Sequence, residues 1–81
     1  MNMGNILAFG IAKEIVGGAS VKILFDDGIT VEDLKAKLVL QFPRLKQLSS
    51  FMIAVNGEYA VPGKIIKQTD EIAIIPPVSG G

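Results

Sequence analysis

The residues that could do chemistry lie together in the final stretch of the sequence. An apolar run at residues 72–75 stops at two prolines, and the sequence then finishes with two glycines. The stretch consists of Pro76, Pro77, Val78, Ser79, Gly80 and Gly81. A frayed chain end is usually polar and has no particular composition. We therefore interpret the backbone carboxylate of Gly81 as the candidate reactive group, and the rest of the chain as a scaffold that presents it.

The side chains offer no comparable reactive group. The sequence has neither His nor Cys, so it lacks the commonest general base and any thiolate nucleophile or metal ligand. Two pairs of adjacent acids, Asp26-Asp27 and Glu32-Asp33, suit a turn and a helix start. We expect no metal site and no self-contained enzyme active site.

Composition narrows the class of protein further. The 81 residues make one domain, of which 49% are hydrophobic with a mean hydropathy of +0.47. That is rich for a small soluble domain, so either the core is dense or some apolar surface meets a partner. A formal charge of zero argues against nucleic acid as a partner. The start of the sequence has no basic signal region, and no run reaches the ~20 apolar residues of a membrane span. We expect a cytoplasmic protein without membrane contact.

Hydrophobic spacing indicates the elements that must present Gly81. A strand is predicted over residues 5–9, followed by a short helical turn in which Ile11 and Ile15 share a face, with a glycine stop. Residues 20–26 alternate as a second strand, with Val21, Ile23 and Phe25 on one face.

The clearest helix is predicted to begin after Thr30, a good N-cap, with Asp33 completing only a weak capping box. Its apolar face consists of Val31, Leu34, Leu38 and Phe42. Pro43 ends it, and Leu45 and Leu48 in the connection that follows are expected in the core.

A hairpin is predicted next, with strands at 51–55 and 58–61 around Asn56-Gly57, a pair typical of a type I′ turn. A linker at 64–67 leads to the last strand at 71–75, with Ile72 and Ile74 facing inward. The order ββαβββ, with one helix covering one face of a mixed sheet, predicts a two-layer α+β domain of the β-grasp (ubiquitin-like) type. We expect this domain at residues 1–75 and a projecting tail at 76–81.

The ending DEIAIIPPVSGG, residues 70–81, resembles that of the small, sulfur-carrying subunits of molybdopterin synthase. Other segments resemble the same family in the same order: residues 7–9 (LAF) with 13–17 (KEIVG), 30–34 (TVEDL) and 53–57 (IAVNG). Lys13 stands where this family usually has Arg. The resemblance covers essentially the whole chain.

The resemblance implies a function for the tail. An E1-like enzyme would use ATP to adenylate the Gly81 carboxylate, and sulfur would replace AMP to give a thiocarboxylate. The tail would then enter the active site of a large subunit and donate its sulfur to a cyclic pterin precursor. Two such transfers build the dithiolene that holds molybdenum or tungsten. The family implies a complex of two small and two large subunits, no permanently bound cofactor, and no catalysis by this chain alone.

The tail residues suit that role physically. Gly80 and Gly81 have no side chains, so they can thread a narrow channel. Pro76 and Pro77 favour extended backbone, which makes the tail project. By resemblance, Phe9, Tyr59 and Ile75 match the family's apolar patch against the large subunit, and Lys13 matches its basic contact.

Two other functions remain open from the sequence. A sulfur carrier of the same fold could serve thiamine thiazole synthesis or tRNA thiolation. Alternatively, the chain could be a ubiquitin-like modifier that is conjugated to lysines, or a module that only docks.

Overall fold

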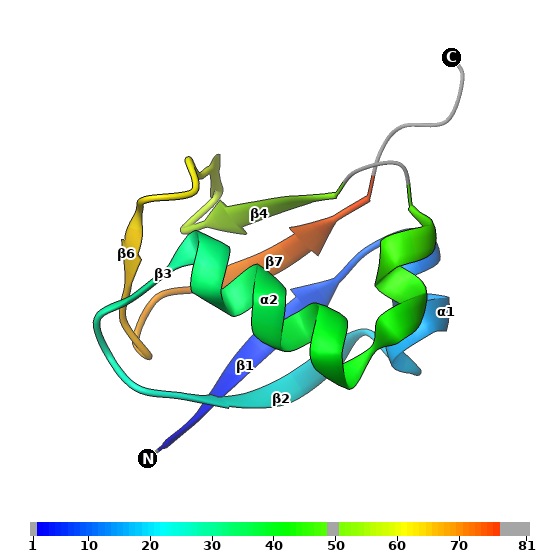
Figure 1. The fold of residues 1–81 in the computed structure, drawn as a ribbon, viewed down its shortest axis with the longest axis horizontal. Coiled ribbons are helices and arrows are strands. Elements are labelled where there is room, and N and C mark those ends of the chain that lie inside the picture. The colour runs from blue at the N-terminus through cyan, green and yellow to red at the C-terminus, as the bar shows by residue number, and fades with distance from the viewer. Residues whose placement is uncertain (1, 49–50, 77–81) are drawn as a thin grey trace.

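The computed structural model describes residues 2–48 and 51–76 (Figure 1). In chain order the elements are β1 (Asn2–Ala8), α1 (Ile11–Val16), β2 (Ser20–Phe25), β3 (Ile29–Thr30), α2 (Val31–Gln41), the 3-10 helix η1 (Pro43–Gln47), β4 (Met52–Val55), β5 (Glu58–Tyr59), β6 (Ile65–Ile66) and β7 (Ile72–Ile75).

The main sheet has five strands in the order β2-β1-β7-β4-β5. Its central strand β7 runs parallel to β1 and antiparallel to β4, and the outer pairs are antiparallel. Helix α2 lies across one face of this sheet (Figure 1). This two-layer arrangement confirms the predicted α+β, β-grasp fold with a mixed sheet and one main helix.

The core lies between α2 and the sheet. The residues of the main sheet that are buried there come from alternate positions of β1, β2, β4 and β7: Ile6, Ala8, Ile23, Phe25, Ile53, Val55, Ile72 and Ile74. The predicted inward faces of the strands are therefore confirmed. Every buried side chain in the described part of the chain is hydrophobic, so the core carries no desolvated charge.

Helix α2 begins and ends where the sequence predicts. Thr30 is extended, with φ −89° and ψ 163°, and its Oγ1 accepts a hydrogen bond of 3.1 Å from the backbone N–H of Asp33. The return bond from the Thr30 N–H to Asp33 Oδ2 is longer, at 3.5 Å, because aspartate is one methylene shorter than glutamate. After Pro43 the connection forms η1, whose Leu45 is fully buried, as expected.

Several details differ from the sequence prediction. The first strand, predicted at residues 5–9, is β1 at Asn2–Ala8, so it begins earlier and ends before Phe9. In α1 the face that packs against the core carries Ala12, Ile15 and Val16, so Ala12 is fully buried whereas Ile11 is 49% exposed. The predicted linker at 64–67 contains β6, which pairs with β3 in a separate two-stranded sheet. The return strand of the hairpin is only β5, which stops before Pro62.

No helix within residues 2–48 and 51–76 is long and apolar enough to cross a membrane.

Candidate functional site

The sheet face opposite α2 carries a continuous row of apolar side chains. Partners on neighbouring strands share a face, and on this face Met52 pairs with Ile75 while Ala54 pairs with both Ala73 and Tyr59.

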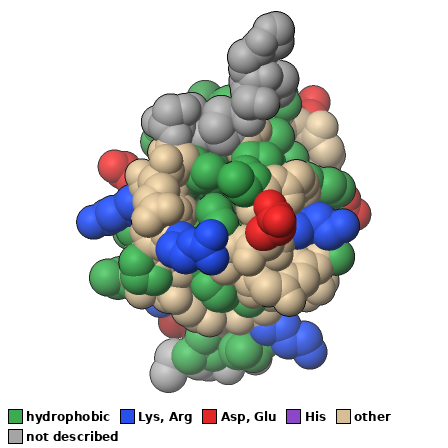
Figure 2. All heavy atoms as spheres, turned by 90° about the vertical axis from the view of Figure 1, so that its right-hand side faces the viewer, with side chains coloured by type: hydrophobic (Ala, Val, Ile, Leu, Met, Phe, Trp, Pro, Cys, Tyr) green, Lys and Arg blue, Asp and Glu red, His purple; other side chains and the backbone are tan. Residues whose placement is uncertain are grey.

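Figure 1 shows that β7 ends at the same end of the molecule as α1. Seen from that end, hydrophobic side chains gather near the middle of the surface, with charged side chains around them (Figure 2).

A groove of about 330 Å³ lies on the sheet face opposite α2, and we call it the Ile75 groove. Its lining residues are Phe9, Ala54, Gly57, Tyr59, Glu71, Ala73 and Ile75. The Phe9 side chain is 48% exposed and that of Tyr59 is 66% exposed, whereas Ile75 is partly buried. Large aromatic side chains with that exposure beside small alanines form a surface that a partner can cover.

The groove unites three of the four residues predicted to contact a partner. Phe9, Tyr59 and Ile75 are far apart in sequence, and the pairing of β7 with β1 and β4 brings them together. Lys13 lies on α1 and does not line the groove, so its role in binding stays a prediction. Ala54 and Ala73, each only 8% exposed, form the floor of the groove, and neither was predicted as a site residue from the sequence.

A tight turn brings Tyr59 over the groove. Asn56 and Gly57 both have positive φ, 53° and 85°, as the predicted type I′ turn requires. Asn56 also joins this turn to the start of β7, since its side-chain amide donates to Asp70 (3.0 Å) and its Oδ1 accepts from the Glu71 N–H (2.9 Å). The turn and the central strand are thereby held in one fixed arrangement.

Asp70 is the acceptor at the centre of this connection. Its other oxygen accepts a hydrogen bond of 2.9 Å from the backbone N–H of Lys67. That backbone bond, followed by the Asn56 bond and the charges of Lys64 and Lys67, lowers the pKa of the Asp70 carboxyl below its ordinary 3.8. The ionised form is the one that the folded protein favours.

The lowered pKa predicts how stability depends on pH. Because the folded pKa is below the unfolded value of 3.8, Asp70 stabilises the fold above pH 3.8 and loses that contribution as the pH falls through the folded pKa. We expect Asp70→Asn to lower the thermal midpoint at pH 7 and the difference from wild type to shrink below pH 3.8. Thermal melts followed by circular dichroism from pH 7 to pH 2 measure this. Asp27→Asn is the control for general carboxylate effects, because Asp27 also accepts a hydrogen bond from a backbone N–H, that of Gln68. If Asp70→Asn lowers the thermal midpoint equally at every pH, the assignment to ionised Asp70 is contradicted.

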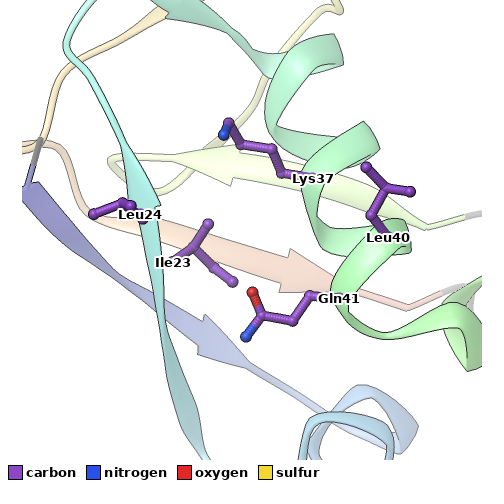
Figure 3. Close-up of a pocket in the computed structure, with 5 residues that line it drawn as sticks. All are labelled: Ile23, Leu24, Lys37, Leu40 and Gln41. Carbon is purple, nitrogen blue, oxygen red and sulfur yellow. The ribbon is translucent and has the colours of Figure 1, made fainter.

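A second groove, of about 410 Å³, lies between β2 and α2 (Figure 3). Its lining residues are Ile23, Leu24, Lys37, Leu40 and Gln41. Ile23 and Gln41 point into the space between strand and helix, and Leu24 points away from it (Figure 3). Lys37 is the single titratable residue in the lining, so this groove has no acid–base pair. Although it is larger, it borders the edge strand β2 and is separate from the end of β7.

Within the described residues, no group of three or more His, Cys, Asp or Glu side chains could hold a metal ion. Pro76 is the last described residue, and its ring lies next to Gly10. The predicted tail residues Pro77, Val78, Ser79, Gly80 and Gly81 lie outside the described residues, so their roles stay predictions.

Comparison with known proteins identifies the family. The ThiS family matches residues 6–81, almost the entire chain. The chain belongs to the ThiS family.

Proteins similar to it in sequence include molybdopterin synthase sulfur carrier subunits. The one from Arabidopsis thaliana is 38% identical over 77 residues, covering 94% of this chain and 80% of the relative. The one from Dictyostelium discoideum is 43% identical over 84 residues, covering 99% of this chain and 98% of the relative. These similarities confirm the resemblance to the small subunits of molybdopterin synthase.

The fold is also shared with solved structures. SAMP1, the small archaeal modifier protein 1 of Haloferax volcanii, superimposes with a TM-score of 0.81 at 29% identity, covering 99% of this chain and 100% of that one. The chain is thus similar both to proteins named as sulfur carriers and to a protein named as a modifier.

Proposed function

We propose that this chain is the sulfur carrier of a molybdopterin synthase. The observation that carries the proposal is the near full-length similarity to curated sulfur carrier subunits, 43% identical in one case. The Ile75 groove supports it, because an apolar docking surface lies where β7 leads into the tail. In this role the chain would be the non-catalytic, sulfur-donating subunit of a sulfurtransferase complex.

The proposed chemistry takes place at the Gly81 carboxylate. That carboxylate attacks the α-phosphorus of ATP in an E1-like enzyme, so a C–O–P linkage forms and pyrophosphate leaves. A sulfur nucleophile at the oxidation level of sulfide then attacks the acyl carbon, and AMP leaves with the electron pair of the broken C–O bond. The product is a thiocarboxylate. In the large subunit its sulfur bonds to a carbon of the cyclic pterin as an oxygen substituent leaves that carbon with the electron pair of the broken C–O bond. Water then cleaves the acyl C–S bond, which restores the carboxylate and leaves the sulfur on the pterin.

The body of the domain would bind and orient the tail. Phe9, Tyr59 and Ile75 would pack against apolar residues of the large subunit, and Lys13 would supply a cationic contact beside them. Pro76 and Pro77 would keep the tail extended, and Ser79, Gly80 and Gly81 would occupy the channel. We place these reactions in the cytoplasm, with two small and two large subunits in the complex.

The alternative functions make different use of the same group. Similarity to SAMP1 favours a modifier, in which a lysine amine rather than sulfur attacks the activated carboxyl and an isopeptide bond forms. A carrier for thiamine or tRNA thiolation would form the same thiocarboxylate but deliver it to another enzyme. All of these functions begin with adenylation of the Gly81 carboxylate. They differ in the molecule that then receives the sulfur or the acyl group.

The test is intact-mass spectrometry of the protein isolated from its native host. We expect a species heavier by the mass difference between sulfur and oxygen, with the change assigned to Gly81. The thiocarboxylated protein, mixed with its cognate large subunit and the cyclic pterin, should yield molybdopterin. Isopeptide adducts without the heavier species would indicate a modifier, and a thiocarboxylate that gives no molybdopterin would indicate another carrier.

A further inference from the structure

Gly10 and Pro76 lie at corresponding places just beyond the ends of the parallel strands β1 and β7. The last register pair of β1 and β7 is Ala8 with Ile74, and Gly10 and Pro76 each lie two residues beyond it. A Cβ added at Gly10 would be 3.2 Å from Cγ of the Pro76 ring, tighter than ordinary van der Waals contact. The proline ring therefore occupies space that a side chain at position 10 would need.

The backbone at Gly10 explains why this space is open. Gly10 has φ 55° and ψ −135°, a conformation that residues with side chains rarely adopt. It turns the chain from β1 into α1, and its carbonyl accepts a hydrogen bond of 3.1 Å from the Lys13 N–H. A fixed turn thus forms one side of the contact.

Pro76 has no N–H, so it cannot extend the hydrogen-bond ladder between β7 and its neighbours. Its ring instead lies beside Gly10, just beyond the end of the sheet. Its sequence neighbour Ile75 lines the Ile75 groove, and so does Phe9, the sequence neighbour of Gly10. The contact therefore sits beside the proposed docking surface.

We infer that Gly10 is a positioning residue for the tail: its missing side chain forms a seat for the Pro76 ring and so fixes the direction in which the chain leaves β7. This inference rests on the proposed function, because it is the delivery of Gly81 that would benefit. A chain fixed at Pro76 has one residue fewer to order when the tail enters the partner. Docking through the groove is a separate step and would not depend on the seat.

The experiment separates tail delivery from docking and folding. Gly10→Ala should slow single-turnover sulfur transfer within the complex by about 5- to 30-fold, the factor that corresponds to ordering one backbone residue. Its affinity for the large subunit should stay within about twofold of wild type, whereas loss of fold would lower that affinity. Gly17→Ala is the matched control: Gly17 also has a positive φ, 87°, but no atom lies within 4 Å of an added Cβ. It should transfer sulfur at the wild-type rate.

A second variant covers the case in which Gly10→Ala does not fold. Pro76→Ala removes the ring that the Gly10→Ala methyl group would displace. It should slow transfer to a similar extent. The double variant should be no slower than either single variant, since both lose one contact. A wild-type rate in Pro76→Ala, or effects that multiply in the double variant, would overturn the inference.

A partner-free measurement keeps this result distinct from the proposed function. Nuclear Overhauser contacts between the Gly10 Hα atoms and the Pro76 ring should be present in the isolated wild-type protein. If they are present but no sulfur is transferred, the proposed function fails while the seat stands. If they are absent, the seat itself is refuted.

Discussion

We expect that deleting Gly81 abolishes sulfur transfer while the domain stays folded. The deletion moves the terminal carboxylate back by one residue, about 3.5 Å along an extended chain. A displacement of even 1 Å can cost about 10²-fold in rate, so transfer should fall by at least about 10²-fold. No described core residue lies beyond Ile74, so the free energy of unfolding should change by less than about 0.5 kcal/mol.

Gly81→Ala is the matched control for this deletion, because it keeps the length of the tail and the position of the carboxylate. It should be adenylated much better than the shortened protein, as measured by ATP-dependent pyrophosphate exchange with the activating enzyme. A thermal midpoint lowered by many degrees in the shortened protein would show that the tail belongs to the fold. Equal activity of the shortened and full-length proteins would exclude Gly81 as the reactive residue.

The second large effect is expected from Ile75→Lys. Ile75 is partly buried on the sheet face opposite α2, where a lysine can reach solvent in the free protein. In a complex the ammonium group would be desolvated against apolar residues, and truncation of comparable central contacts costs about 2–4 kcal/mol. We expect the affinity for the large subunit to fall by about 10²-fold or more. Isothermal titration calorimetry measures it, and circular dichroism checks the fold.

Ile65→Lys is the matched control, because it is the same substitution at an isoleucine that is 51% exposed and does not line the groove. It should bind the large subunit like wild type. Tyr59→Ala provides a test that does not disturb the core, since Tyr59 is 66% exposed; it should also weaken binding. If Ile75→Lys unfolds the domain and Tyr59→Ala binds normally, the groove is not the interface.

The parts of the fold that the sequence predicts correctly are those with a strong local signal. The inward faces of β2, β4 and β7 follow from alternation, and the start of α2 follows from Thr30 and the acids after it. β3 and β6 have two residues each, too few to show alternation, and they exist only because they pair with each other. The burial of Ala12 instead of Ile11 depends on which face α1 turns to the core, and the spacing of apolar residues in so short a helix does not decide that.

The candidate site also has features that the sequence predicts and features that only the fold reveals. The composition of the tail is visible in the sequence, and so is the tight turn at Asn56-Gly57. The floor formed by Ala54 and Ala73 and the contact of Gly10 with Pro76 are not visible there, because they join positions that only the strand order brings together. A glycine after a strand can serve many turns, and its neighbour becomes evident only in three dimensions.

The central place of β7 has a mechanical consequence. β7 is paired on both sides, with β1 along Ile72–Ile74 and with β4 along Ile72–Ile75. A partner that grips the tail and pulls along the strand therefore loads two hydrogen-bond ladders together in shear, so that no single bond can open ahead of the others. An edge strand would instead peel away bond by bond. The chain can thus be held under tension by its end without unravelling, as repeated insertion into and withdrawal from a narrow channel would require.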